Sequence, residues 1–291
     1  IANNRGVTLD IEMPTKAFVS LSAFCELVEG QGNFPFDGLA ADLKKIRRKL
    51  YDQMPSYIEV ESLGWHKKGY MLFSNGVCEG KQFHKIDKYG FVKVGEDHFY
   101  LPALSSVNDN EESKAMYESE RKFRYVTRED TNFKKWASLF CRVHKDNGKI
   151  ALAWFMASLF RDHIYNLFKF FPHLFLFGPP GTGKSQVGWS IRSLGFVGIK
   201  KPFNLNGGTK VAFHREFSHF TNFPCWFDEY DNNIEWERVQ SLKAAYDGAG
   251  HTKSVKDSRN KTETVPVNSS CMISGQQMPI SDNALFKRVI L

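Results

Sequence analysis

Apolar positions recur along the chain with two different periods, and the change of period divides it into regions. Between residues 39 and 50 the apolar side chains stand three or four positions apart, which predicts an amphipathic helix. Five cations occupy the remaining faces of this helix: Lys44, Lys45, Arg47, Arg48 and Lys49. Such a face is either solvated or in contact with phosphates, and the solvated face is the commoner case. From residue 57 to 101, short runs rich in β-branched and aromatic residues predict a small domain that is α/β or mostly β.

The second half of the chain has the pattern of an α/β domain. Residues 149–171 form its most apolar stretch, but Arg161 and Asp162 interrupt it, so a buried amphipathic helix fits better than a membrane span. From His173 onward, strands, a glycine loop and helices alternate, which predicts a parallel sheet. We therefore expect an N-terminal accessory α/β domain (1–104), a polar linker (105–130), a helical segment (131–170) and an α/β core (171–291).

Composition narrows the classes of protein and of partner. With 291 residues, 42% hydrophobic and 14% aromatic, the chain is globular and long enough for about two domains. Its formal net charge of +7 fits an anionic partner such as nucleic acid without requiring one. The five cysteines are scattered without metal-ligand spacing, which favours reduced thiols inside a cell. His214 and His219 lack a third ligand, so they do not predict a metal site. The chain starts without methionine and stops inside an apparent strand, so we expect a fragment of a longer protein.

A complete phosphate-loop motif follows an apolar strand and precedes a helix. It reads Gly178, Pro179, Pro180, Gly181, Thr182, Gly183, Lys184 and Ser185, which matches G-x-x-x-x-G-K-[ST] throughout. Glycines let successive backbone N–H groups curl around phosphate oxygens, and the helix N-terminus adds its positive end. Lys184 is expected to contact the β- and γ-phosphates of ATP, and the Ser185 hydroxyl to bind Mg²⁺. A chance glycine-rich turn is the less favoured reading.

Two later segments supply the polar groups that hydrolysis requires. About 44 positions after the loop, an apolar strand ends in Asp228, which suits Mg²⁺ binding, and Glu229, which suits activation of a water. A third strand ends in Ser274, Gly275, Gln276 and Gln277, and Gln276 is the predicted neighbour of the γ-phosphate if that strand lies between the other two. Arg288, with Lys287 as second candidate, precedes the last strand and suits stabilisation of a phosphoryl group. Each could instead be an ordinary polar residue at a strand end or in a loop.

In this order the segments resemble the AAA+ ATPase core of superfamily 3-like helicases, with MCM-like helicases of mobile elements as a related possibility. The resemblance covers residues 171–291 and is carried by GPPGTGKS, WFDEYDN, LKAAYDGAGHTKS, SSCMISGQQMP and ALFKRVIL. It implies a three-layer P-loop NTPase core with a parallel sheet, a hexameric ring of identical subunits, primase or other replication domains elsewhere, and the cytoplasm of a bacterial or phage-infected cell. Family members end the third strand in an asparagine, the sensor residue, which lies beside the γ-phosphate. This chain has SGQQ there, so the identity of its sensor residue stays open.

The resemblance also implies a role for the basic segment 251–267, HTKSVKDSRNKTETVPV. Such helicases carry a hairpin between the acidic and third strands that enters the pore of the ring and contacts single-stranded DNA. The segment suits that role, because cations can follow phosphates without reading bases. The expected DNA-binding residues are Lys253, Lys256, Arg259 and Lys261. A solvated loop is the alternative.

Together these features predict an ATP-driven DNA helicase or translocase of a replication protein, with Arg288 supplied to the neighbouring subunit. An AAA+ regulatory or protein-remodelling ATPase, whose basic loop contacts a protein, is the alternative from another class. Stimulation of ATP hydrolysis by DNA distinguishes the two, as does salt-sensitive DNA binding, because phosphate contacts give a steep dependence on salt. A small-molecule kinase is disfavoured, since Glu229 suits water activation and nothing resembles an acceptor site.

Overall fold

The computed structural model describes residues 1, 5–32, 34–53, 55–127, 129–254 and 262–291. The chain forms two compact units, each made of two separate stretches of sequence. The first unit contains residues 1–60 and 84–117, and the second contains residues 61–83 and 118–291. The polypeptide thus passes from the first unit into the second, returns to the first, and then completes the second. None of the described helices has the length and apolar character that a membrane span requires.

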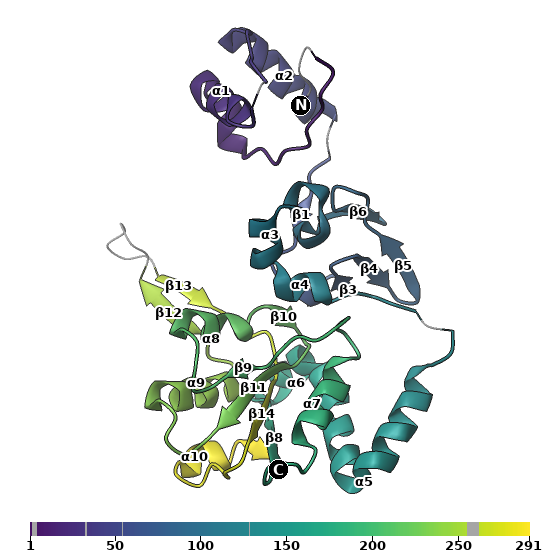
Figure 1. Cartoon of the computed structure of the whole chain (residues 1–291), viewed down its shortest axis with the longest axis vertical. Helices are drawn as coiled ribbons and strands as arrows, with labels where there is room; N and C mark the ends of the chain where they lie inside the picture. Colours follow the sequence, from purple (N-terminus) through teal and green to yellow (C-terminus); the bar gives the residue numbers. More distant parts are fainter. Residues whose placement is uncertain (2–4, 33, 54, 128, 255–261) are drawn as a thin grey trace. The chain divides into compact units, whose positions relative to one another are not determined.

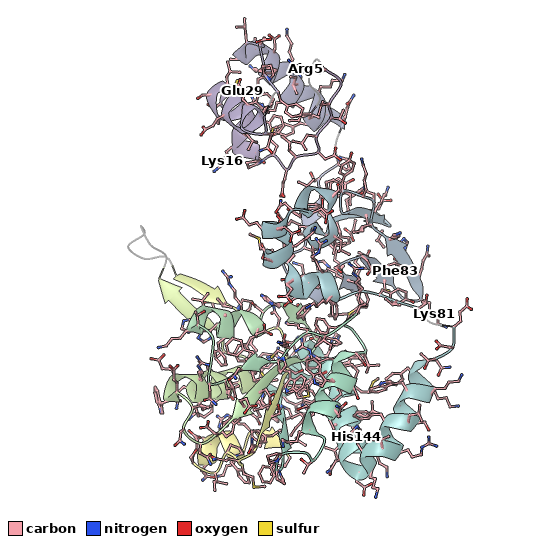
Figure 2. All side chains as sticks on the ribbon, viewed as in Figure 1. Arg5, Lys16, Glu29, Lys81, Phe83 and His144 are labelled. Atoms are coloured by element: carbon pink, nitrogen blue, oxygen red, sulfur yellow. The ribbon has the colours of Figure 1, made fainter. Side chains whose placement is uncertain are left out.

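The first unit combines a small helical cluster with a three-stranded sheet (Figure 1). Its elements are η1 (Thr15–Phe18), α1 (Leu21–Glu29), α2 (Ala40–Gln53), β1 (Ile58–Glu59), β6 (Phe91–Val94), β7 (Asp97–Tyr100), η2 (Pro102–Leu104), η3 (Ser106–Asn108) and α3 (Glu111–Met116). Helix α2 confirms the amphipathic helix expected near residues 39–50: Leu43 is buried in a core with Phe24 and Val28. The surface of this cluster is mixed: Val19 and Leu39 are exposed, and so are Lys16 and Glu29, which are labelled in Figure 2.

An antiparallel meander opens the second unit and pairs with a strand far away in sequence. It consists of β2 (Leu63–His66), β3 (Tyr70–Phe73), β4 (Gly76–Glu79) and the first two residues of β5 (Gln82–Lys85), and β10 (Phe220–Thr221) lies parallel to β2. The Ser62 hydroxyl lies within hydrogen-bonding distance of the Ser218 and His219 carbonyls, at 3.0 and 3.2 Å. Residues 61–83 therefore pack with the C-terminal part of the chain, whereas the sequence pattern groups them with residues 1–104.

Phe123 joins the meander to the C-terminal part. Its ring is fully buried and lies 4.9 to 5.2 Å, between centroids, from four other rings. These rings belong to Phe73, Phe196, Phe220 and Phe223. The polar stretch expected to be a linker thus contributes a core residue, and it also contains helix α4 (Glu118–Lys122).

The helical segment expected before the core is present as α5 (Phe133–Ser158) and α6 (Arg161–Phe168). Helix α5 is itself kinked at Lys145, whose backbone is not helical (φ 52°, ψ −132°). Asn132 caps α5 by accepting a hydrogen bond from the Lys135 N–H at 3.0 Å. The apolar stretch 149–171 is not one helix, because the chain breaks at Leu159 and Phe160 before α6 begins. Its inner face is buried through Ala151, Trp154 and Phe155, as expected for an amphipathic helix.

The remainder is an α/β arrangement around a five-stranded sheet with the order β15-β8-β14-β11-β9, in which every pair is parallel. The α/β class expected from the sequence is confirmed. The elements are β8 (His173–Phe177), α7 (Lys184–Arg192), β9 (Phe203–Asn204), α8 (Lys210–Glu216), β11 (Cys225–Tyr230), α9 (Trp236–Tyr246), β12 (His251–Ser254), β13 (Thr262–Val265), β14 (Cys271–Gly275), α10 (Asn283–Phe286) and β15 (Val289–Ile290).

Helices cover both faces of this sheet, which explains why its strands are apolar runs rather than alternating ones (Figure 1). On one face, α8 and α9 together with the turn after α8 contribute Phe213, Phe217 and Leu242 to a core with Phe227 of β11. On the other face, α7 lies against Trp226, the residue before Phe227 in β11. Since successive strand residues point to opposite faces, β11 serves both layers.

Candidate functional site

The carboxyl ends of β8, β14 and β11 meet at one edge of the sheet, and a pocket of about 380 Å³ lies there. Ligand sites of open α/β sheets occupy this kind of position. The pocket is lined by Pro180, Gly181, Thr182, Gly183, Lys184, Ser185, Gln186, Asp228, Glu229, Gly275 and Gln276. The structure thus brings together most of the predicted phosphate loop, both predicted carboxylates and the predicted glutamine, which come from three separate segments of the sequence.

The predicted phosphate loop curves between the end of β8 and the start of α7. The Lys184 ammonium donates hydrogen bonds to the carbonyls of Gly178 and Pro179, the latter at 2.8 Å. The Thr182 hydroxyl also donates to the Pro179 carbonyl, at 2.8 Å. Gly178 and Pro179 therefore act through their carbonyls, on the inside of the turn. Helix α7 begins at Lys184, so Ser185 lies at its positive end.

The two acidic residues lie at an irregularity of β11. The register of β11 against β14 shifts between Phe227 and Tyr230, and Glu229 has a left-handed backbone with φ of 60°. In a regular strand, adjacent side chains would point to opposite faces. Here Asp228, which is half-buried, and Glu229, which is exposed, both line the same pocket. Left-handed backbone at a non-glycine residue is costly and tends to occur at functional sites.

Strand β14 lies between β8 and β11, the arrangement on which the prediction for Gln276 depends. Gln276 lines the pocket, while the side-chain oxygen of Gln277 accepts a hydrogen bond from the Asn232 N–H at 3.0 Å. The residue of this strand in contact with an acidic residue is Ser274, whose hydroxyl donates to Asp228 Oδ1. The sequence pattern includes Ser274 at the strand end but gives it no role. The feature of the sequence that could have identified Ser274 is a hydroxyl inside an otherwise apolar strand.

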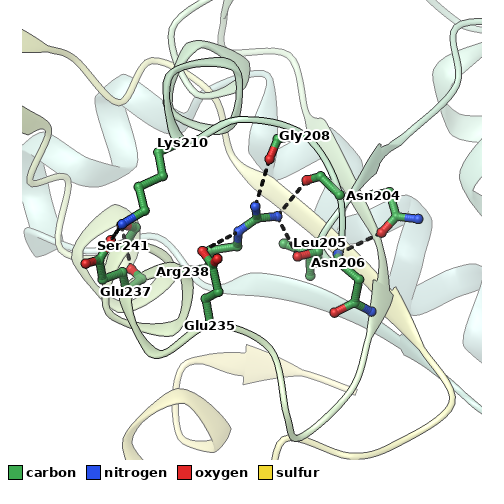
Figure 3. Close-up of polar contacts among 10 residues, drawn as sticks. Asn204, Leu205, Asn206, Gly208, Lys210, Glu235, Glu237, Arg238 and Ser241 are labelled. Carbon is green, nitrogen blue, oxygen red and sulfur yellow. Dashed lines mark hydrogen bonds and ion pairs between the residues drawn. The ribbon is translucent and has the colours of Figure 1, made fainter.

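A second support for the acidic strand comes from the loop after β9, which Arg238 of α9 holds in place (Figure 3). The Asn206 side chain donates to the Glu229 carbonyl at 2.8 Å and to Asp231 Oδ2 at 3.1 Å. The loop itself is held by the buried guanidinium of Arg238, which donates to three of its carbonyls, those of Leu205, Gly207 and Gly208. Sequence reasoning misses Asn206 and Arg238, because neither belongs to a motif.

Arg288 lies near the beginning of strand β8, whereas the predicted phosphate loop follows the end of that strand. The neighbouring Val289 pairs with His173, the first residue of β8. The guanidinium donates to the Ala284 carbonyl at 3.0 Å and to Asp247 at 3.3 Å. It also lies over the Tyr246 ring, 5.2 Å from the centroid. Arg288 therefore does not line the pocket of its own chain.

The basic segment contains the two strands of an antiparallel hairpin, β12 and β13, in which Lys253 stands opposite Glu263. Three of the expected DNA-binding residues, Lys256, Arg259 and Lys261, lie outside the described residues. At the root of the hairpin the rings of His251 and His214 stack with centroids 3.9 Å apart. Burial, and then the charge of His251, lower the pKa of His214 to about 4. A pocket of about 170 Å³ adjoins this pair.

The pocket at the strand ends contains side-chain oxygens of the kind that bind magnesium. No cluster of three or more histidine, cysteine or acidic side chains within the described ranges is placed to hold a metal ion. Magnesium does not need one, since it keeps several waters and is bound by one or two protein oxygens together with substrate phosphates. Ser185 and Asp228 line the pocket and can supply those oxygens. Comparisons with family models and with curated proteins gave no match.

Proposed function

We propose that this chain is the ATPase core of a ring-forming DNA helicase or translocase of the AAA+ class. The observation that carries the proposal is the convergence of a complete phosphate-loop motif, two carboxylates and the end of a third strand on one pocket. The parallel sheet supports it, because the third strand lies between the phosphate-loop strand and the acidic strand. The basic hairpin between the acidic and third strands supports the nucleic-acid part.

In the proposed site, backbone N–H groups of residues 181–185 and the Lys184 ammonium bind the phosphates of ATP. Lys184 would exchange its hydrogen bonds to Gly178 and Pro179 for phosphate oxygens. Ser185 and Asp228 would hold Mg²⁺, which neutralises phosphate charge and orients the β- and γ-oxygens. Glu229 would accept a proton from the attacking water. Its carboxylate is exposed and its backbone is left-handed, which suits contact with a water in the pocket rather than with the protein.

Arg288 would act on the nucleotide of a neighbouring subunit, since it does not line its own pocket. Its contacts with Tyr246 and Asp247 connect the end of α9 to the end of α10. A movement of either helix would therefore change the proposed interface with the neighbouring subunit. The hairpin begins only four residues after Asp247, which offers a short route from that interface to the DNA. Movement of the hairpin on hydrolysis would convert phosphate chemistry into translocation of single-stranded DNA.

The nucleic-acid part is tested by the combined substitution Lys256→Ala, Arg259→Ala and Lys261→Ala. We expect loss of DNA unwinding and of DNA-stimulated hydrolysis, with basal ATP hydrolysis retained, because the cations contact phosphates of DNA and not the nucleotide. A matched control replaces Lys44, Arg48 and Lys49 of α2, three exposed cations in the other unit. Unwinding that is unchanged in the hairpin variant would contradict a role in DNA binding and favour a protein-remodelling ATPase.

A further inference from the structure

A buried chain of side-chain contacts connects the helix after the phosphate loop to Asp228. Trp226 is fully buried, and its ring lies so close to α7 that a Cβ at Gly188 would stand 2.6 Å from it. The Trp189 ring packs against Trp226 edge to face, with centroids 5.0 Å apart. The indole thus separates α7, which begins at Lys184 and Ser185, from the acidic strand. The Trp226 ring is therefore one of the contacts that set the spacing between α7 and β11.

The indole N–H also has a specific polar partner. Trp226 Nε1 donates to Ser274 Oγ at 2.7 Å, and Ser274, itself 1% exposed, donates to Asp228 Oδ1. An indole nitrogen can only donate, so the serine oxygen must accept from it. The single hydroxyl hydrogen of Ser274 is then left for Asp228, which must accept. The direction of both hydrogen bonds is therefore set by Trp226.

The contacts of Asp228 indicate what this chain of hydrogen bonds achieves. Its Oδ1 is occupied by Ser274, and no hydrogen bond from another described residue engages Oδ2. A single bond from a buried, oriented donor fixes the carboxylate and leaves one oxygen for a ligand in the pocket. Tryptophan and serine are unusual choices for packing alone, since each brings a polar group into a layer where an apolar residue would fill the space.

We propose that Trp226 and Ser274 are positioning residues, which hold Asp228 at a fixed place relative to Ser185 so that the two can share one Mg²⁺. This inference rests on the proposed ATPase function. It assigns the contact between β14 and the acidic strand to Ser274 rather than to Gln276. Partners that orient a metal ligand commonly change metal affinity or activity by about 10 to 100-fold when removed. The effect should therefore fall on metal dependence and not on binding of the phosphates.

The first test measures ATP hydrolysis against Mg²⁺ concentration for Ser274→Ala, with Ser274→Thr as the conservative variant and Gln276→Ala as the comparison. We expect the half-saturating Mg²⁺ concentration to rise about 10-fold or more in Ser274→Ala, and Ser274→Thr to restore it. Binding of a fluorescent ATP analogue in EDTA should be unchanged. The double variant Trp226→Phe, Ser274→Ala removes both partners and leaves no unpaired donor, so it guards against a folding defect.

The second test reads the contact without relying on hydrolysis. With ¹⁵N-labelled tryptophan, the indole resonance of Trp226, assigned by its loss in Trp226→Phe, should shift on Asp228→Asn. The shift should disappear when Ser274 is alanine, because the contact passes through the hydroxyl. If Ser274→Ala is folded and has wild-type Mg²⁺ dependence, the positioning role is wrong even though the ATPase stands. If the indole responds as expected but no ATP is hydrolysed, the relay stands and the proposed function fails.

Discussion

Among single residues, Glu229 combines a conformational cost with the most demanding chemical role proposed for the chain. Its φ of 60° disfavours any side chain, yet the position carries an exposed carboxylate in the pocket. A left-handed backbone at a non-glycine residue costs roughly 1 to 3 kcal/mol. The surrounding hydrogen bonds, including that of Asn206 to the Glu229 carbonyl, maintain the conformation. Stability and activity should therefore respond in opposite directions at this residue.

We predict that Glu229→Gly raises the free energy of unfolding by about 0.5 to 1 kcal/mol, because glycine adopts positive φ freely but loses more entropy on folding. The same variant should lose ATP hydrolysis by a factor of about 10² to 10⁴, the contribution typical of a general base. Urea denaturation and steady-state kinetics measure the two effects. Glu229→Gln is the matched control, since it keeps the strain and removes only the base. A glycine variant less stable than the glutamine variant would show that the backbone is not strained.

What the sequence reveals about a residue depends on whether that residue acts through a local motif. That Lys184, Ser185, Asp228 and Glu229 line one pocket could be predicted, because the spacing of each motif and its flanking strand are local features of the sequence. Their roles in binding and hydrolysing ATP stay predictions. The contact between Ser274 and Asp228 depends instead on which strands are neighbours, which is a tertiary property.

The hairpin cations are a separate case. Lys256, Arg259 and Lys261 lie outside the described residues, so their role in DNA binding stays a prediction that rests on the sequence. Lys253 is the expected DNA-binding residue that the structure describes, and it belongs to strand β12.

Among the elements, the loop after β9 depends on a single buried side chain of α9. Arg238 is 6% exposed and donates to the carbonyls of Leu205, Gly207 and Gly208 (Figure 3). A buried carbonyl without a partner is costly, so the buried Leu205 carbonyl in particular relies on this guanidinium. The loop in turn presents Asn206 to the acidic strand. A helix residue that does not line the pocket therefore supports its geometry.

We predict that Arg238→Met lowers the free energy of unfolding by about 2 to 3 kcal/mol, because hydrogen bonds from a charged donor are lost and the buried Leu205 carbonyl is left without this partner. Hydrolysis should fall as well, since the Asn206 contact with Glu229 loses its support. Arg238→Lys should recover only part of the stability, as an ammonium lacks the planar fork that serves several carbonyls at once. Urea denaturation and kinetics of the two variants test this. A methionine variant with wild-type stability would mean that the loop is held by other contacts.

Elements are predicted best where one period continues without interruption. The strands β8, β11 and β14 lie where their apolar runs predict them. Helix α2 also lies where its period predicts it, but Leu43 is its buried residue while Ile46 is exposed. The apolar stretch 149–171 is expected to be one helix, but it divides at Leu159, where no glycine or proline marks the break. The turn there comes from packing, because Phe155 contacts Phe223 on one side and the Asp162 N–H bonds to Asn222 on the other.

Across the whole molecule, the chain order does not give the boundaries of the two units. The pairing of β2 with β10 joins Leu63 to Phe220, positions more than 150 residues apart. Local patterns contain no information about such a pair, so the sequence pattern groups residues 61–83 with the N-terminal domain. Gly64 shows how close the approach is: a Cβ there would stand 2.2 Å from the Thr221 carbonyl oxygen.

We predict that Gly64→Ala lowers the free energy of unfolding of the second unit by at least about 2 kcal/mol, because the strained backbone adds to a clash with a neighbouring strand. Gly69→Ala is a matched control: its φ of 90° is similar to the 97° of Gly64, but a Cβ there would meet no atom of a non-adjacent described residue within 4 Å. The control should lose only the conformational part, about 1 kcal/mol. Equal losses in the two variants, measured by thermal and urea denaturation, would contradict a tight β2 and β10 contact.

The proposed function requires that the pocket hydrolyses ATP and that DNA controls the rate. The decisive measurement is steady-state ATP hydrolysis against protein concentration, with and without single-stranded DNA, using Glu229→Gln as the blank. We predict a rate per subunit that rises with protein concentration, because the proposed ring has Arg288 act on the nucleotide of a neighbour, and that rises again with DNA. Hydrolysis no faster than that of the Glu229→Gln blank, or a rate that DNA does not change, would contradict the proposal.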